Sequence, residues 1–251
     1  MYLHVIGSGA GGSPGSRRWR AANLLEAEGG LAVVDCGVGC HYRLSDRGLL
    51  AEIDYVFVTH SHMDHFLGLP EALFQAHIEG RRKKLVVVAP KIVARAIEAV
   101  SPNLLKAVNY QIEIRQAAPG PLLELPGLKV EAAQACHHTA EEAYAYRLEG
   151  GGTSLLFTGD TSPNCGPVRR LGRGVDVLIH EATCNEQNAE ICAKYAHTTT
   201  LQAVKEADAA GAHLLVLTHI DDGFNPTIYR DVKNIGRKDV VIAEDNMWLR
   251  I

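Results

Sequence analysis

The chain has 251 residues, of which 47% are hydrophobic and 22% charged, and its formal net charge is −4. A chain of this length can bury a large apolar core without stabilising cross-links, so we expect one globular domain over residues 1–251. The composition disfavours disordered, fibrous and small disulfide-rich classes, and the net charge provides no global basic field for nucleic acid. No apolar run reaches the ~18 residues of a membrane helix and no secretory signal opens the chain, so we expect a cytoplasmic protein without membrane contact.

Short apolar runs in the first half predict strands that end in polar or glycine-rich residues. In chain order these strands are Leu3–Ile6, Leu31–Val34, Tyr55–Thr59 and Leu85–Ala89. Helical periodicity predicts helices over Leu69–Glu79 and Pro90–Val100, the second with its proline in the first turn. The basic run Arg81–Lys84 lies between a helix and a strand, which favours a solvated turn over a phosphate-binding patch.

The second half repeats this alternation of strands and helices. Strands are predicted over Lys129–Ala135, Leu155–Thr158, Val175–Ile179, Leu214–Thr218 and Val240–Ala243. A helix over Thr199–Ala210 is opened by a threonine run and closed by Gly211. Strands in both halves with helices after several of them indicate a layered α/β protein, with two sheets or one large mixed sheet.

Five of the predicted strands are followed directly by a segment that contains histidine or aspartate. In layered α/β folds, ligands bind at the carboxyl ends of strands. We therefore expect these segments to converge at one edge of the sheets: His60–His65, His137–His138, Asp160, His180–Glu181 and His219.

The densest of these segments is His60-Ser61-His62-Met63-Asp64-His65. Imidazole and carboxylate groups are ligands for zinc and similar divalent ions. A loop after a strand can turn these side chains inward in pairs, whereas neither a helix nor a strand places all four on one face. Together with another aspartate and two more histidines, the segment would complete two metal sites.

The pattern His60-x-His62-x-Asp64-His65 resembles the signature of the metallo-β-lactamase superfamily of binuclear metallohydrolases. The resemblance covers nearly the whole chain and implies a four-layer αβ/βα sandwich with the metals at one edge. It implies that His60 and His62 bind the first ion, that Asp64, His65 and His219 bind the second, and that Asp160 bridges both. The remaining ligand is His137 or His138, and the Tyr146-Arg147 pair downstream favours His138.

Within the superfamily, the second half resembles ribonuclease Z, the endonuclease that trims tRNA 3′ ends. His180-Glu181-Ala182-Thr183 is similar to its HEAT loop, and His197-Thr198-Thr199 stands where that family has His-Ser-Thr. The resemblance implies a catalytic role for His197 and a place beside the substrate for His180. It also implies dimers, because members of the family are often dimeric.

Three departures from the ribonuclease Z pattern affect the parts that handle tRNA. The long arm that grips the tRNA body has no room here, because only a predicted hairpin with Gly150–Gly152 at its tip separates Arg147 from Asp160. The family's Pro-x-Lys-x-Arg-Asn loop has Ser16 in place of lysine and Trp19 in place of asparagine. The family's Ser-x-Arg-Tyr after the last histidine is replaced by Asp221–Phe224.

The sequence therefore predicts a phosphodiesterase of ribonuclease Z-like type that acts on a small or single-stranded phosphodiester, with nucleic acid as a candidate substrate. Two divalent ions, zinc first and manganese or iron otherwise, would hold a hydroxide between them that attacks phosphorus. Asp64 would orient this nucleophile, and His197 would assist the leaving oxygen. Arg17 and Arg18, in a glycine-rich loop, are candidates for binding the anionic substrate.

Three other functions compete with this prediction. A lactone, thioester or β-lactam hydrolase would use the same hydroxide, a true tRNA 3′-processing endonuclease would keep the family's substrate, and an accessory protein would only bind ligand.

None of the six cysteines forms a Cys-x-x-Cys pair, which favours reduced, partly buried thiols.

Overall fold

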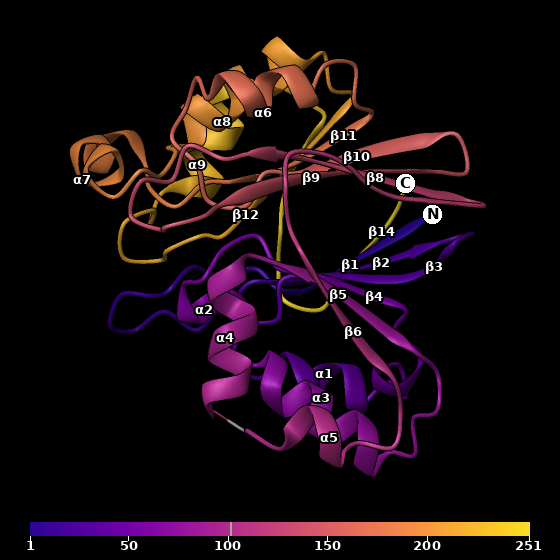
Figure 1. Cartoon of the computed structure of the whole chain (residues 1–251). Coiled ribbons are helices and arrows are strands. Elements are labelled where there is room, and N and C mark those ends of the chain that lie inside the picture. Colours follow the sequence, from indigo (N-terminus) through magenta and orange to yellow (C-terminus); the bar gives the residue numbers. More distant parts are fainter. Residues whose placement is uncertain (101) are drawn as a thin grey trace.

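The computed structural model describes residues 1–100 and 102–251. Two mixed sheets of seven strands face each other, and helices cover both outer faces (Figure 1). This is the four-layer αβ/βα sandwich that the sequence predicts. Both chain termini lie at the end of the sandwich opposite α2 (Met63–Phe66) and α7 (Ala189–Lys194) (Figure 1).

The first sheet is formed mainly by the first half of the chain. Its strand order is β14 (Met247–Arg250), β1 (Tyr2–Gly7), β2 (Ala22–Ala27), β3 (Gly30–Val34), β4 (Tyr55–Phe57), β5 (Leu85–Ala89) and β6 (Ile112–Gln116). Pairing is antiparallel from β14 to β3 and parallel from β3 to β6.

The second sheet mirrors this arrangement. Its strand order is β13 (Val240–Ile242), β12 (Leu214–Thr218), β11 (Val177–Glu181), β10 (Thr153–Phe157), β9 (Tyr144–Gly150), β8 (Leu128–Gln134) and β7 (Gly120–Leu125). Strands β10 to β13 are parallel, and β7 to β10 are antiparallel. In each sheet the parallel half directs its carboxyl ends to the same edge, where polar loops can meet.

Helices complete the two outer layers. The first sheet is covered by α1 (Cys40–Ser45), α3 (Leu69–Ile78), α4 (Lys91–Val100), α5 (Leu104–Ala107) and the 3₁₀ turn η1 (Leu50–Glu52). The second sheet is covered by α6 (Gly166–Leu171), α8 (Thr200–Ala210) and α9 (Ile228–Ile235), with η2 (Glu186–Asn188) leading into α7. None of the helices in the described residues is long and apolar enough to cross a membrane.

The apolar core follows from these layers. Alternate strand residues such as Leu25, Phe57 and Ile179 fill the space between the two sheets. The opposite strand faces pack against helices, with Val87 beneath the helices of the first half and Leu215 beneath those of the second. The two sheets are also joined by hydrogen bonds, because Tyr144 N donates to Thr59 O at 2.9 Å.

Each of the nine predicted strands overlaps an observed one, and the three predicted helices are α3, α4 and α8. Thr199 caps α8 in a capping box with Gln202, and Gly211 ends the helix with φ of 71°. The expectation for Arg81 is wrong. Its side chain is buried and donates hydrogen bonds to the carbonyl oxygens of Ala51 and Ile53, so it braces the turn from inside.

Candidate metal and active site

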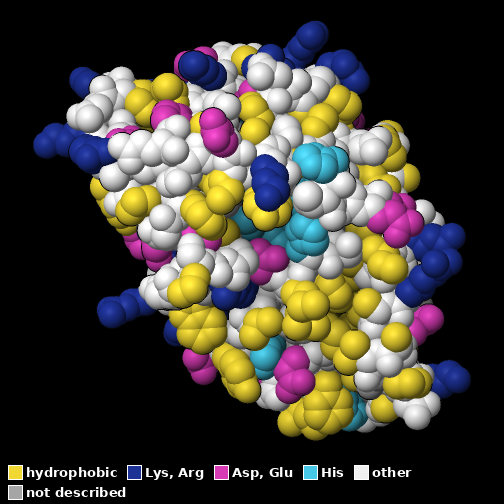
Figure 2. Space-filling model, turned by 90° about the vertical axis from the view of Figure 1, so that its left-hand side faces the viewer, with side chains coloured by type: hydrophobic (Ala, Val, Ile, Leu, Met, Phe, Trp, Pro, Cys, Tyr) yellow, Lys and Arg dark blue, Asp and Glu magenta, His cyan; other side chains and the backbone are white. Residues whose placement is uncertain are grey.

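Loops from the two sheets bring seven histidine and aspartate side chains together at one edge of the sandwich. His60, His62, Asp64 and His65 follow β4 of the first sheet. The second sheet contributes residues that follow three of its strands: His137 after β8, Asp160 after β10 and His219 after β12. Figure 2 shows histidine side chains in a hollow on this face of the molecule. The predicted convergence of strand ends is therefore observed.

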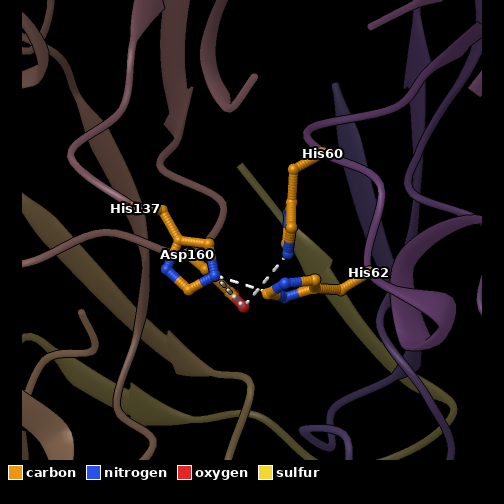
Figure 3. Close-up of side chains that lie close together, drawn as sticks. All are labelled: His60, His62, His137 and Asp160. Atoms are coloured by element: carbon orange, nitrogen blue, oxygen red, sulfur yellow. Dashed lines mark hydrogen bonds and ion pairs between the residues drawn. The ribbon is translucent and has the colours of Figure 1, made fainter. Parts of the chain in front are cut away.

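The first group of side chains consists of His60, His62, His137 and Asp160 (Figure 3). One nitrogen or oxygen atom from each of the four lies within 4.8 Å of the others. His60 Nε2 is 3.4 Å from Asp160 Oδ2, and His137 Nε2 is 3.2 Å from His62 Nδ1. Three imidazoles and one carboxylate form a donor set of the kind that binds zinc.

The second group consists of Asp64, His65 and His219. The Nε2 atoms of His65 and His219 are 3.1 Å apart, and His219 Nε2 is 3.3 Å from Asp64 Oδ2. This group therefore also presents nitrogen and oxygen donors to a common point.

Asp160 lies between the two groups. Its Oδ2 is 3.4 Å from His60 Nε2 and 3.3 Å from His65 Nε2, while its Oδ1 is 3.3 Å from His219 Nε2. Burial opposes ionisation of this carboxyl, but the surrounding histidines, led by His219, hold its pKa well below the ordinary value. An ionised, fully enclosed carboxylate between two donor sets is suited to bridging two cations.

Four of the histidines are oriented through the ring nitrogen that points away from the cluster. An oxygen atom holds each Nδ1 and so leaves Nε2 directed inward, an arrangement typical of metal-binding histidines. The pairs are His60 with Thr59 Oγ1 at 3.0 Å, His65 with Asp35 Oδ2 at 2.8 Å, His137 with Ala196 O at 3.0 Å and His219 with Thr183 Oγ1 at 3.0 Å.

Two inward-facing atoms, His60 Nε2 and Asp160 Oδ1, are buried without a hydrogen-bond partner. Unpaired polar atoms are costly to bury in a folded protein, and a bound cation would satisfy both. The donor set and these unpaired atoms therefore fit divalent metal ions.

Backbone strain accompanies the site. Asp35 and His219 have φ values of 64° and 51°, which non-glycine residues rarely adopt. Gly159, with φ of 57°, precedes Asp160, and a Cβ there would lie 2.8 Å from Thr59 Cβ. The close approach of β10 to the histidine loop thus requires glycine at this position.

The expectation that His138 completes the first group is corrected by the structure. His137 is buried and lies in the cluster, whereas His138 is exposed. The chain turns directly after His137, where Ala140 N donates to His137 O at 3.1 Å, so the side chain of His138 is directed away from the cluster.

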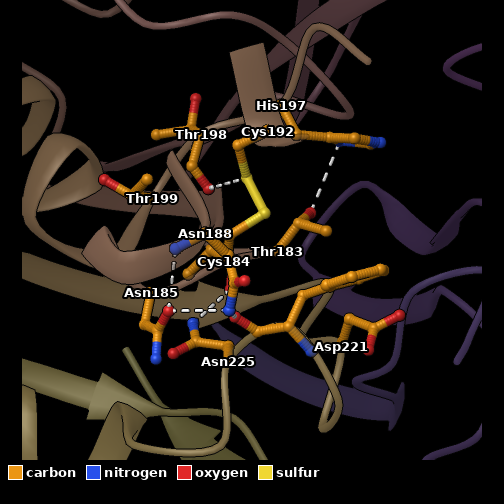
Figure 4. Close-up of a disulfide and its surroundings, with 12 residues drawn as sticks. Thr183, Cys184, Asn185, Asn188, Cys192, His197, Thr198, Thr199, Asp221 and Asn225 are labelled. Carbon is orange, nitrogen blue, oxygen red and sulfur yellow. Dashed lines mark hydrogen bonds between the residues drawn. A yellow bond between two sulfur atoms is a disulfide. The ribbon is translucent and has the colours of Figure 1, made fainter. Parts of the chain in front are cut away.

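His197 lies beside the cluster, as expected. Its Nδ1 is 3.1 Å from Glu181 Oε1 and 3.9 Å from Asp160 Oδ2. Burial lowers the pKa of this imidazole, but the Glu181 carboxylate outweighs burial and raises it to about 9. Thr183 Oγ1 lies 3.4 Å from the same Nδ1 (Figure 4), so the ring is held on one nitrogen, while Nε2 has no hydrogen-bond partner among the described residues.

Glu181, which the sequence analysis gives no role of its own, is the residue that anchors this region. Its buried carboxylate accepts hydrogen bonds from Thr161 N, Thr183 Oγ1 and Thr198 N, besides its contact with His197. The HEAT-like segment could have predicted this role of Glu181. Side chains alternate along β11, so Glu181 and His180 lie on opposite faces and only one of them can face the cluster.

The expected substrate contact of His180 is therefore wrong. Its ring is buried behind β11, and Nδ1 lies 2.8 Å from the carbonyl oxygen of Glu181. His180 belongs to none of the donor groups in the described residues.

The two arginines proposed for substrate binding have different environments. Arg18 donates to Asp222 at 3.0 Å and to Ser8 Oγ and Ala243 O at 2.8 Å, and its side chain is only 9% exposed. It fixes the glycine-rich loop to the second half of the chain, so the expectation that it binds substrate is corrected. Arg17 is exposed and remains a candidate.

Cysteines also depart from the expectation of reduced thiols. Disulfides join Cys136 to Cys165 and Cys184 to Cys192, and Cys36 and Cys40 are buried as free thiols. Cys136 precedes the cluster residue His137, and Cys184 follows Thr183, whose hydroxyl contacts His219, so each disulfide fixes a loop beside the cluster.

Comparison with known proteins shows similarity to ribonuclease Z sequences and to a tRNase Z structure. The ribonuclease Z of Methanosarcina acetivorans is 26% identical over 302 aligned positions, covering 99% of this chain and 98% of that protein. The ribonuclease Z of Methanopyrus kandleri is 29% identical, covering 100% and 98%. The crystal structure of human tRNase Z, short form, superposes with a TM-score of 0.85 at 23% identity, covering 100% of this chain and 99% of that one.

The alignment with the Methanosarcina protein is longer than this 251-residue chain, so that relative contains insertions. In this chain β9 and β10 are joined by a tight turn at Gly151 and Gly152. The family model of the β-lactamase superfamily domain matches residues 32–220. With the four-layer fold and the histidine and aspartate cluster, this match shows that the chain belongs to the β-lactamase superfamily and has the metallo-β-lactamase fold.

Proposed function

We propose that the protein is a metal-dependent phosphodiesterase of ribonuclease Z type that acts on a small or single-stranded phosphodiester. The observation that carries the proposal is the Glu181–His197 pair, which lies beside the seven side chains that would hold the cations, with His197 itself within 4.8 Å of donor atoms of Asp160 and His219. Hydrolysis of an acyl bond has no evident need for such a pair, whereas a poor alkoxide leaving group needs a proton donor.

The metals supply charge neutralisation at phosphate oxygens and activation of water when bound. We propose two ions, zinc first and manganese or iron as alternatives, because His and Asp donors suit all three. His60, His62, His137 and Asp160 would hold one ion, and Asp64, His65, His219 and Asp160 the other.

The chain's own residues then orient the reaction. Asp64 Oδ2 is 3.3 Å from His219 Nε2 and its side chain also lines the cavity beside the cluster, where it can accept a hydrogen bond from the attacking water. His197 is cationic at neutral pH with its pKa near 9, so Nε2 can donate a proton to the leaving oxygen. Glu181 keeps the imidazole oriented throughout.

A panel of four substrates tests this function on metal-loaded protein: a phosphodiester, a phosphomonoester, a lactone and a thioester. We expect turnover of bis(p-nitrophenyl) phosphate well above that of the other three. Preferential hydrolysis of the lactone or thioester would instead identify an acyl hydrolase, and no turnover of any ester would identify a ligand-binding protein.

Nucleic acid is the partner that we propose, in single-stranded form, because the short β9–β10 turn offers no arm for a folded tRNA. A gel assay with single-stranded RNA and with a tRNA precursor tests this. Cleavage confined to the tRNA 3′ end would show that the arm is dispensable.

A cytoplasmic location follows from this proposed substrate, although disulfides persist in the cytosol mainly in hyperthermophiles. Thiol titration of protein isolated under acid-quenched conditions tests whether both disulfides form there. Six reactive thiols after denaturation would show the reduced protein, and two would show both disulfides intact.

We also propose a homodimer. Helices α1 and α3 pack together and expose Tyr42, Phe74 and Ile78, a set of large apolar side chains suited to self-association. Sedimentation equilibrium of the wild type and of Phe74→Glu distinguishes a dimer from a monomer.

A further inference from the structure

A cavity of about 200 Å³ opens directly onto the cluster and has two chemically different walls. One wall is formed by site residues that include His62, Asp64 and His197. The other is formed by Ile191, Tyr195 and Phe224, which lie outside the proposed machinery. A group bonded to phosphorus at the cluster would extend toward this apolar wall.

Phe224 is fixed before any ligand arrives. Its backbone nitrogen donates to Asp221 Oδ1 at 3.1 Å, and its carbonyl oxygen accepts from Asn185 N at 2.9 Å and Asn188 Nδ2 at 2.8 Å. Asp221 is itself held by Ser13, so the aromatic ring is presented by a residue whose backbone nitrogen and carbonyl oxygen are both engaged. Such pre-organisation reduces the entropy lost on binding.

Tyr195 is held in place by a separate support. It follows α7, and its nitrogen donates to Ile191 O and Cys192 O at 3.2 Å. The disulfide from Cys192 to Cys184 ties this helix to a residue that lines the cavity (Figure 4). The tyrosine ring is half exposed, at 48%, as expected for a residue at the rim that is free to contact a ligand.

The charges around the cavity restrict what can enter. Its lining contains no lysine or arginine among the described residues, and the ionisable acids there are Asp64, Asp160 and Asp221. Bound cations at the cluster would attract one phosphate group. A second phosphate placed against the far wall would meet carboxylate charge and no cation, so the remaining part of the substrate must be uncharged there.

From this geometry we infer that the cavity binds a planar aromatic group of the substrate, namely the base of a single nucleotide, between Tyr195 and Phe224. The inference rests on the proposed phosphodiesterase function and deepens it. The cavity is smaller than the ~300–1,000 Å³ of sites for drug-sized ligands, so it accommodates about one ring system. Aromatic side chains stack on every base, so we expect preference for a base and little preference among bases.

Calorimetric titration of the Zn²⁺- or Mn²⁺-loaded protein with adenosine 5′-monophosphate and with ribose 5-phosphate tests the inference. The two ligands have the same phosphate and sugar and differ in the base. We expect the nucleotide to bind about tenfold more tightly or better. Equal affinities would overturn the inference.

Variants assign the preference to the two rings. Tyr195→Ala and Phe224→Ala should each lower the affinity for the nucleotide about tenfold and leave that for ribose 5-phosphate unchanged, whereas Tyr195→Phe and Phe224→Tyr should retain the preference. Tyr2→Ala, which removes an exposed tyrosine on β1 outside the cavity, is the matched control. Tyr195→Ala decides the question if Phe224→Ala does not fold, because Tyr195 is exposed.

The p-nitrophenyl ring of the model substrate could also enter the cavity. Uridine 3′-(methyl phosphate), added as a competitor of bis(p-nitrophenyl) phosphate, therefore tests whether the cavity binds a nucleotide base. Competition by the uridine compound that disappears in Tyr195→Ala supports binding of the base, and the absence of competition in the wild type contradicts it.

Failure of the proposed function can be distinguished from failure of this inference. A protein that prefers the nucleotide but hydrolyses no phosphodiester would retain the cavity assignment and lose the enzymatic one, and hydrolysis without base preference would do the reverse.

Discussion

The Nε2 atom of His65 faces the Nε2 atom of His219 at 3.1 Å, although the two residues are 154 positions apart in the chain. Each ring is bonded through Nδ1 to an oxygen, on Asp35 and Thr183 respectively. Without a metal, this contact is a hydrogen bond that needs a proton on one of the two nitrogens. A divalent cation between them would replace that proton, and the remaining donors of the cluster surround the same region.

The metal site can be tested by replacing each of the adjacent residues His137 and His138 with alanine in turn. His137→Ala should lose metal affinity by about 10- to 100-fold or more, because His137 lies in the donor group, and His138→Ala should keep wild-type metal content. Mass-spectrometric metal analysis after dialysis against a weak chelator measures both. Asp160→Ala and His62→Ala should lose metal like His137→Ala, and retention of metal by Asp160→Ala would contradict the proposed bridge.

Substitution of His197 should reduce turnover without reducing metal binding. His197→Ala should lower kcat for bis(p-nitrophenyl) phosphate by about 10²- to 10⁴-fold with unchanged metal content, because the variant removes the proton donor and none of the seven proposed ligands. Glu181→Gln should lower kcat as well, since the carboxylate sets the charge and orientation of the imidazole. Wild-type turnover by His197→Ala would show that the residue has a different role.

The disulfide between Cys184 and Cys192 should stabilise the region around His197. His197 N donates to Cys192 O at 2.8 Å, so opening the disulfide would loosen the support of the His197 ring. We expect Cys184→Ser/Cys192→Ser to lower the free energy of unfolding by about 2 kcal/mol, given its short loop, and to reduce kcat more than metal content. The control is Cys40→Ser, which removes a buried free thiol; denaturant unfolding and turnover are the measurements.

The stability of the protein should fall in mild acid, in part because of His4. Its ring is buried, stacks on Trp248 with a centroid distance of 4.2 Å and has no hydrogen-bond partner at either nitrogen. Burial, assisted by Arg47, lowers the pKa of His4 to about 4. The unfolded chain takes up a proton near pH 6.5 and the folded chain only near pH 4, so the contribution of His4 to stability is complete above pH 6.5 and is lost as the pH falls toward 4.

His4→Phe should therefore flatten the decline of the unfolding free energy between pH 6.5 and 4, and it should stabilise the protein at pH 5. Denaturant unfolding at several pH values measures this. His213→Phe, at an exposed position, is the matched control and should leave the slope unchanged. An unaltered slope in His4→Phe would contradict the assignment.

Much of the fold could be predicted because its strands are short apolar runs with clear ends, as in β5 (Leu85–Ala89). Five strands in the described residues match none of the nine predicted runs. Two of these five, β2 (Ala22–Ala27) and β9 (Tyr144–Gly150), the second expected only as part of the hairpin before Asp160, contain alanine, leucine and glutamate, which favour helices. Each of them pairs on both sides with neighbouring strands, so tertiary pairing overrides local preference.

The site was predictable where the spacing of residues determines chemistry, as in His60-x-His62-x-Asp64-His65. Spacing could not determine which of two neighbouring side chains points inward, and this is why His138 and His180 were expected where His137 and Glu181 are found. Arg18 shows a related limit. A sequence reveals its charge but not the acids on a distant loop, Asp222 among them, that already neutralise it.

The cluster is divided between the two halves of the sandwich, since the ligands before Phe66 come from one sheet and those after Ala135 from the other (Figure 3). Neither half alone contains a full set of donors for either ion. A nascent or half-folded chain therefore contains no complete donor set at which to bind metal. Competence arises only when both sheets have docked, so the placement of the ligands couples activity to completion of folding.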